Sequence, residues 1–371
     1  MACFIFLNLA RRYENYPFFD IFVPHKYWEL PNYTEEEAPR IRRHFQEMRR
    51  VPIEYRSFLG WTHVPYEGDT LTINEKGDRA IPVSEDDNSI SANSATVRFF
   101  GGSVTWGFGL EDEDTIPAIF QKNNPQYQVY NHGELSFNSR QNLERLIHLT
   151  AIKEEVDIVI FIDGVNEILS QENPNIEVPG HAFEVAIREK TNREILNFSD
   201  SYGEAASILF YRYIFDTIQL FFTPPHQQDV PVNNPGFNQE KVDQIAYNLL
   251  VNWRIAREIT EHEGGRFFAI LQPHLHTGSP RFDHLEEHYH HIMTPYYRAV
   301  YEEIYRLMDK YEYDWIIDMT DIFDIDEYIY TDGFHFSRRG SEIMSARIGD
   351  MIHQNMSSDS FDNDNPEAIN H

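Results

Sequence analysis

A serine, an aspartate and a histidine occur in this sequence where they could form a nucleophilic catalytic site. Ser103 follows an apolar run and two glycines in FFGGSVTWGFG, and Asp332 and His335 lie three residues apart in YTDGFHFSRRG. A carboxylate can orient an imidazole, which can then take the proton of a serine hydroxyl. Taken alone, Ser103 could instead be a helix N-cap or part of a phosphate-binding loop.

The sequence around Ser103 does not match the common phosphate-binding loops. No lysine follows as in G-x-x-x-x-G-K-[ST], and GGSVTWGFG does not fit G-x-G-x-x-G. A nucleophile also needs donors for a developing oxyanion. The backbone N–H groups of Ser103 and Gly133 and the side-chain amide of Asn166 could supply them. Each residue could also be an ordinary turn or cap residue, but their occurrence after successive apolar runs favours one shared site.

Recurring apolar runs bounded by turn residues indicate the elements that must position these groups. The runs lie at 96–100, 127–131, 156–163, 266–273 and 315–318. The first three start roughly 30 residues apart, the length of a βαβ unit, and helical stretches separate them. Near-continuous apolar strands indicate a sheet buried on both faces. We therefore expect an α/β fold, a three-layer α/β/α sandwich with a parallel, flavodoxin-like sheet of about five strands. In such sheets, ligands bind beyond the carboxyl ends of the strands.

The remaining segments suggest a division of the chain into three parts. Residues 1–92 are expected to form an N-terminal accessory region with a helix and β-hairpins. Residues 93–355 form the α/β domain, interrupted by an aromatic-rich insertion at 168–238 that is either an extra helix on the core or a lid over a cleft. The polar, acidic residues 356–371 are expected to be a disordered tail.

Composition excludes several classes of function. The formal net charge is −29, so the protein is expected to repel nucleic acid and anionic lipid headgroups. Cys3 is the single cysteine, which excludes an intrachain disulfide and a cluster of thiolate ligands. The apolar run near the N-terminus is too short to span a bilayer. The chain as given is expected to be soluble. Its compartment stays open: cytoplasmic, or exported or anchored if the N-terminus is truncated.

Four motifs, taken together, resemble a known family. GGSVTWG, NHG, GVNE and DGFH occur in the order and at the spacing of the SGNH hydrolases, also called the GDSL lipase/esterase superfamily. The resemblance covers about residues 95–355. Two residues depart from the family's motifs. Gly102 occupies the position of the aspartate in the common Gly-Asp-Ser, and Glu167 occupies the position of the aspartate in the usual Asn-Asp.

The resemblance implies a role for each matching residue. It implies that Ser103 is the nucleophile, that Asp332 and His335 complete a catalytic triad, and that Gly133 and Asn166 are oxyanion donors beside the Ser103 N–H. It also implies the flavodoxin-like sandwich already expected from periodicity. Relatives with an N-terminal hairpin region are associated with acylated sugars, which is an analogy of fold.

A histidine-rich segment at 272–291 offers a different chemistry. His284, Glu287 and His288 match the metal-binding pattern H-x-x-E-H, and His274 or His276 could supply a third ligand. The alternatives are a solvated helix start, or His274 and His276 lining the mouth of the active site as substrate-binding residues. We retain the last of these and expect no metal.

The sequence thus predicts a serine esterase that works through an acyl-serine intermediate and needs no cofactor. The expected substrate is a small-molecule or saccharide ester, with acetyl or another short acyl group on a carbohydrate as the first choice. A lipase- or thioesterase-like hydrolase and an O-acyltransferase using the same triad are alternatives, since all pass through an acyl-serine. A metalloprotein and a non-enzymatic binding module are further ones. No nucleic acid partner and no membrane span are expected, and the oligomeric state is open.

Overall fold

The structure is a computed structural model. It describes residues 26–82, 94–169, 178, 180–184, 187–188, 190–192, 239–285 and 294–362. Most of the predicted insertion at 168–238 and the last residues of the predicted tail lie outside these ranges. No helix within them is both long enough and apolar enough to cross a membrane.

Five parallel strands form the central sheet. They are β5 (Thr96–Gly101), β6 (Gln128–Asn131), β7 (Ile158–Asp163), β8 (Arg266–Leu271) and β9 (Ile316–Asp318). Their order is β6-β5-β7-β8-β9, and every neighbouring pair is parallel. This is the flavodoxin-like order, in which the chain reverses its direction of winding beside the first strand, β5. The predicted fold class is confirmed, and each strand falls within or overlaps one of the five apolar runs.

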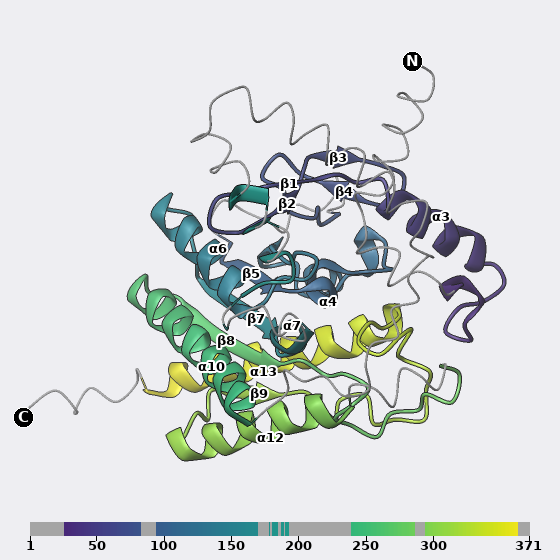
Figure 1. Ribbon diagram of the computed structural model, residues 1–371. Coiled ribbons are helices and arrows are strands. Elements are labelled where there is room, and N and C mark those ends of the chain that lie inside the picture. The colour runs from purple at the N-terminus through teal and green to yellow at the C-terminus, as the bar shows by residue number, and fades with distance from the viewer. Residues whose placement is uncertain are drawn as a thin grey trace, which may run out of the picture.

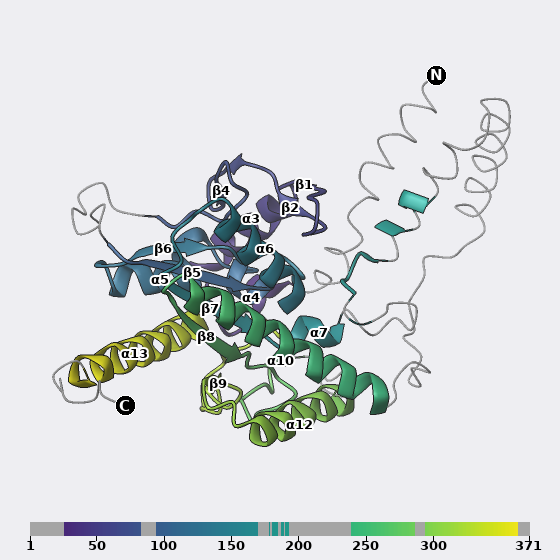
Figure 2. The same ribbon diagram turned by 90° about the vertical axis from the view of Figure 1, so that its left-hand side faces the viewer.

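Helices cover both faces of this sheet (Figures 1 and 2). One face carries α5 (Ile116–Asn123) and α13 (Arg338–Asp362), and the other carries α6 (Ser139–Ala151), α10 (Gln239–His262) and α12 (Thr294–Tyr311). The strand β7 shows why both faces must be covered, because Val159 and Phe161 pack toward α10 while Ile158 and Ile160 pack toward α13. The helix α13 continues to Asp362, so residues 356–362 are helical where a disordered tail is predicted.

The N-terminal region contains the expected helix and hairpins. Its elements are η1 (Tyr27–Glu29), α3 (Ala38–Met48), β1 (Ile53–Glu54), β2 (Thr62–His63), β3 (Tyr66–Glu67) and β4 (Thr72–Ile73). β1 pairs with β2, and β3 with β4, both antiparallel. The apolar face of α3, with Ile41, Phe45 and Met48, shares a hydrophobic cluster with Trp106 and Phe108 of the α/β domain. Figure 1 shows these elements beside the short helix α4 (Ser103–Trp106).

A buried arginine joins this region to the loop that follows β5. The Arg79 guanidinium donates hydrogen bonds to the carbonyls of Trp106 (3.1 Å), Gly107 (2.7 Å) and Leu110, and to the Asp112 carboxylate at 2.9 Å. It also lies 4.6 Å from the centroid of the Trp106 ring, where the cation is attracted to the aromatic face. Carbonyls that α4 leaves without intrahelical partners are therefore satisfied from another part of the chain.

We expect Arg79→Met to lower the free energy of unfolding by about 3–5 kcal/mol, because it removes a buried charged donor from three carbonyls and from the Asp112 carboxylate. Denaturant unfolding followed by circular dichroism measures this change. The matched control is Arg56→Met in the same region, whose exposed guanidinium pairs with Glu54 at 3.1 Å. The control is expected to cost less than about 1 kcal/mol. Equal costs for the two variants would show that Arg79 does not anchor the region.

Candidate active site

The candidate nucleophile stands at the start of a single helical turn. β5 ends at Gly101, Gly102 adopts an extended conformation as N-cap, and α4 runs from Ser103 to Trp106. Gly107 ends the turn with a φ of 94°, a left-handed conformation that glycine adopts without strain. Ser103 is partly exposed, whereas the other residues of α4 are buried. The serine hydroxyl thus sits at the carboxyl edge of the sheet, beside the point where the chain reverses direction.

Ser103, His335 and Asp332 form one hydrogen-bonded line. The His335 Nε2 lies 2.7 Å from the Ser103 Oγ, and the His335 Nδ1 lies 2.7 Å from the Asp332 Oδ2. The Phe108 ring lies 4.3 Å from the imidazole, centroid to centroid, and limits its movement on one side. With Nδ1 donating to the carboxylate, Nε2 is free to accept the serine proton.

The Asp332 carboxylate is buried and fully hydrogen-bonded. Its Oδ1 accepts the backbone N–H groups of Phe334 (2.8 Å) and His335 (2.7 Å). Its Oδ2 accepts the Tyr27 hydroxyl at 3.0 Å in addition to the imidazole. Burial acts to raise the pKa of Asp332, but the charge of His335 and these hydrogen bonds outweigh it, so this pKa lies below its usual value. The carboxylate therefore stays ionised and can stabilise an imidazolium beside it.

Two of the expected oxyanion donors lie next to Ser103. The Ser103 N–H has no hydrogen-bond partner among the residues that the structure describes. The Asn166 side chain, at the start of α7 (Val165–Leu169), donates one N–H to the carbonyl of Phe137 at 2.7 Å and keeps a second for another acceptor. Its Nδ2 lies 2.1 Å from the place where a Cβ on Gly102 would be. A side chain at position 102 would therefore have to displace the Asn166 amide.

Gly133 lies at the same edge but its N–H is engaged. It donates to the Asn131 Oδ1 at 3.0 Å. A Cβ at this position would lie 2.4 Å from the Trp106 backbone nitrogen, so glycine is needed here for the close approach of this loop to α4. Its function as a donor stays a prediction and requires a substrate oxygen to share or replace the contact with Asn131.

Glu167 supports this part of the site and is given no role by the sequence motifs. Its carboxylate accepts the N–H groups of Ser139 (2.5 Å), at the start of α6, and Gly164 (3.0 Å), at the end of β7. The loops that follow β6 and β7 are thereby tied together directly beside Asn166. Burial raises the pKa of Glu167. Aspartate, which is usual at this position of the motif, has a side chain one methylene shorter. The carboxylate of Glu167 therefore reaches further from the backbone than that of an aspartate would.

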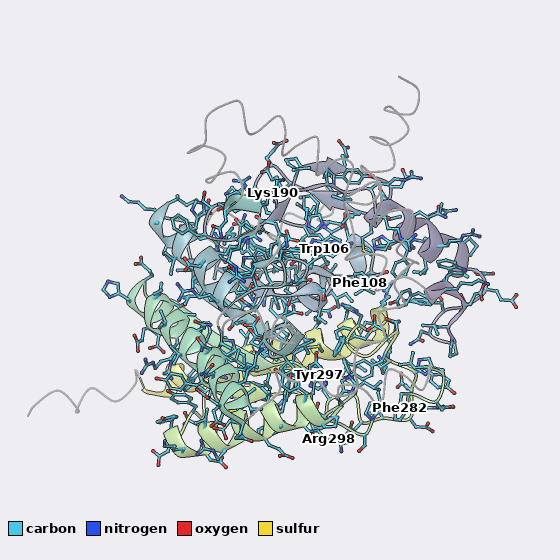
Figure 3. The ribbon with its side chains drawn as sticks, viewed as in Figure 1. Trp106, Phe108, Lys190, Phe282, Tyr297 and Arg298 are labelled. Atoms are coloured by element: carbon cyan, nitrogen blue, oxygen red, sulfur yellow. The ribbon has the colours of Figure 1, made fainter. Side chains whose placement is uncertain are left out.

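His274 and His276 lie behind the triad loop and not at an exposed mouth. Their exposed fractions are 0% and 2%. The ring of His276 stacks on Tyr297 at 5.0 Å and lies 5.6 Å from Phe334, which directly precedes His335. Figure 3 shows Tyr297 on the inner side of α12. The segment that contains both histidines follows β8 at the carboxyl edge of the sheet, as expected. Aromatic residues of α12 cover it, however. The burial of the two histidines therefore does not support the prediction that they line the mouth of the active site.

Only some of the residues of the metal-binding alternative are described by the structure. Glu287 and His288 lie outside the described residues. The His284 Nε2 lies 2.8 Å from the carbonyl oxygen of Tyr330, so this nitrogen is engaged with backbone. The described part of the chain contains no group of three or more His, Cys, Asp or Glu side chains that could hold a metal ion.

Several solved structures are similar to this chain at low sequence identity. A lipolytic protein of the G-D-S-L family from Veillonella parvula has 12% sequence identity and a TM-score of 0.38, over 68% of this chain and 94% of that chain. A GDSL-like lipase from Bacteroides thetaiotaomicron has 13% identity and a TM-score of 0.39, over 72% and 92%. A carbohydrate acetylesterase family member from Sinorhizobium meliloti has 14% identity and a TM-score of 0.39, over 70% and 98%.

The family named in two of these descriptions is the one that the four sequence motifs resemble. No family model matches the chain, and no curated protein matches it either. At these identities and TM-scores, the chemistry of the site rests on its own residues.

We expect Gly102→Ala to slow the labelling of Ser103 by a fluorophosphonate about 10²-fold, because the added Cβ displaces the Asn166 amide. Mass spectrometry of the adduct measures the rate. The matched control is Gly349→Ala in α13, where the nearest atom to the added Cβ is 3.6 Å away. The control should keep the wild-type rate. Labelling of Gly102→Ala at the wild-type rate would argue against Asn166 as a donor.

Proposed function

We propose that this protein is a serine ester hydrolase of the SGNH type. The observation that carries the proposal is the hydrogen-bonded line from Ser103 through His335 to Asp332, with the Ser103 N–H and the Asn166 amide beside the hydroxyl. A positioned base, a buried orienting carboxylate and adjacent donors are the groups that acyl transfer through a serine requires.

In the proposed reaction, the Ser103 Oγ attacks the ester carbonyl while His335 Nε2 accepts its proton. The carbonyl oxygen becomes an oxyanion that accepts hydrogen bonds from the Ser103 N–H and Asn166, and from Gly133 if its N–H leaves Asn131. Collapse of this intermediate expels the alcohol, which takes the proton from His335. Water then attacks the acyl-serine with His335 again as base, and the acid leaves with Ser103 restored.

For the substrate we propose a neutral carbohydrate that carries acetyl or another short acyl group. The net charge of −29 disfavours anionic lipid surfaces and acidic polysaccharides. Three alternatives use the same residues: a lipase-like enzyme and a thioesterase-like enzyme acting on longer acyl chains, and an O-acyltransferase in which a sugar hydroxyl replaces water. Carbohydrate acetylesterase and acetyl xylan esterase are the names of two structures with a similar fold, at 14% and 13% identity.

The first expected result is that the protein hydrolyses p-nitrophenyl acetate and that Ser103→Ala lowers kcat at least about 10³-fold. Removing the hydroxyl removes the attacking atom. Asn166→Ala is expected to lower kcat about 10²–10³-fold, since one oxyanion donor is lost. Ser345→Ala is the matched control, because its buried hydroxyl lies in α13 without a hydrogen-bond partner among the described residues.

The same assay is run with and without EDTA. Activity that survives in Ser103→Ala and is lost with EDTA would overturn the serine mechanism and favour the histidine-rich segment. Activity that depends on Ser103 and is unaffected by EDTA supports the proposal.

The second expected result concerns the substrate. We expect kcat/KM for p-nitrophenyl acetate to exceed that for the octanoate at least about tenfold, and acetate to be released from a neutral acetylated xylo-oligosaccharide. Anionic phospholipid vesicles should not be hydrolysed. A preference for the octanoate would favour a lipase- or thioesterase-like enzyme, and acetylated sugar formed from an added acceptor would favour transfer.

A further inference from the structure

The N-terminal region reaches the candidate triad through one tyrosine. Tyr27, in η1, donates its hydroxyl to the Asp332 Oδ2 at 3.0 Å across a separation of 305 residues. This is the same carboxylate oxygen that lies 2.7 Å from the His335 Nδ1. Tyr27 is 1% exposed, so water does not compete for the contact.

The segment that follows Tyr27 is fastened to the loop that leads to Asp332. The Asn32 side-chain amide donates to the carbonyls of Tyr328 (2.7 Å), Ile329 (3.2 Å) and Tyr330 (3.2 Å). The same short stretch of chain thus holds the triad loop both at its approach and at its carboxylate.

The tyrosine ring itself is held by two phenylalanines. It stacks on Phe45 of α3 at 4.7 Å with an interplanar angle of 15°, and it meets the edge of Phe108 at 6.2 Å. Phe108 in turn lies against the His335 imidazole. Both the ring and the hydroxyl of Tyr27 are therefore fixed relative to the triad, and rigid support of this kind is what a catalytic geometry requires.

We propose that Tyr27 is a positioning residue that extends the triad to a fourth group, an inference that rests on the proposed esterase function. The hydroxyl directs the Asp332 Oδ2 toward the imidazole and shares its negative charge. It acts through Asp332 and touches neither the substrate nor the serine. The expected effect of its loss is on the step in which His335 takes a proton, with substrate binding unchanged.

The test is Tyr27→Phe, which keeps the ring and removes the hydroxyl. We expect kcat to fall about tenfold or more, with KM changed less than about twofold. The matched control is Tyr66→Phe, which removes another tyrosine hydroxyl of the N-terminal region, one that donates to the Glu47 carboxylate at 3.3 Å and not to a triad residue. Assays are run well below the lower of the two melting temperatures. A kcat for Tyr27→Phe equal to that of Tyr66→Phe would overturn the proposal.

A spectroscopic signature separates positioning from general packing. The proton between His335 Nδ1 and Asp332 is expected as a downfield proton resonance, assigned by its loss in Asp332→Asn. In Tyr27→Phe this resonance should shift or broaden, whereas Tyr66→Phe should leave it in place. In the unaltered protein it should show a cross-peak to the Tyr27 hydroxyl proton, a readout that does not depend on whether a variant folds. Absence of the cross-peak while the resonance itself is sharp would also overturn the proposal.

The two proposals can fail separately. If wild-type protein hydrolyses esters through Ser103 and Tyr27→Phe behaves as wild type, only the role of Tyr27 is wrong. If wild-type protein has no Ser103-dependent activity, the esterase function is wrong, and the resonance still reports whether Tyr27 positions Asp332.

Discussion

A single helical turn cannot fix a serine by its own hydrogen bonds, and much of this structure meets that constraint. Isolated helices shorter than about 12–15 residues are marginal in water. The turn α4 has only a few backbone hydrogen bonds of its own. In two of them, the Trp106 N–H donates to the Gly102 carbonyl and the Gly107 N–H donates to the Ser103 carbonyl. The buried carbonyls at the end of α4 instead accept hydrogen bonds from Arg79, which lies outside the α/β domain. The position of the hydroxyl is thus set by packing from several parts of the chain.

Buried carboxylates serve as ties between the loops around this turn. A buried charge is costly unless its oxygens accept hydrogen bonds, so each such group fixes the segments that supply its donors. Glu167 joins the loops after β6 and β7, and Asp332 joins its own loop to η1. Asp78 accepts from Arg145 and lies 2.7 Å from the His132 Nδ1, in the loop that contains Gly133. The acidic composition has a structural use here, beyond its effect on the surface charge.

The parts of the fold and site that the sequence predicts are those coded locally. Apolar runs of strand length predict the five strands, and the positions of Ser103, Gly133 and Asn166 after successive runs predict that they share one edge of the sheet. What is missed depends on contacts distant in sequence. Nothing in the residues around Tyr27 indicates a contact 305 residues away, and Glu167 appears only as a departure from a motif. His274 follows its strand as expected, but periodicity does not show that α12 covers it.

Residues of the predicted accessory region contact the candidate site and the loops around it. Beyond Tyr27 and Arg79, the backbone N–H of His63 donates to the Glu134 carboxylate at 3.0 Å, and the His63 ring stacks on Trp106 at 5.0 Å. Phe108 lies between Phe45 and His335, so the N-terminal cluster and the imidazole share one aromatic contact chain. Each contact supplies a donor or a surface that the α/β layers lack at that place. A sheet and its helices can bring the reacting groups to one edge, but holding them at hydrogen-bond distances here depends on residues that precede the first strand of that sheet.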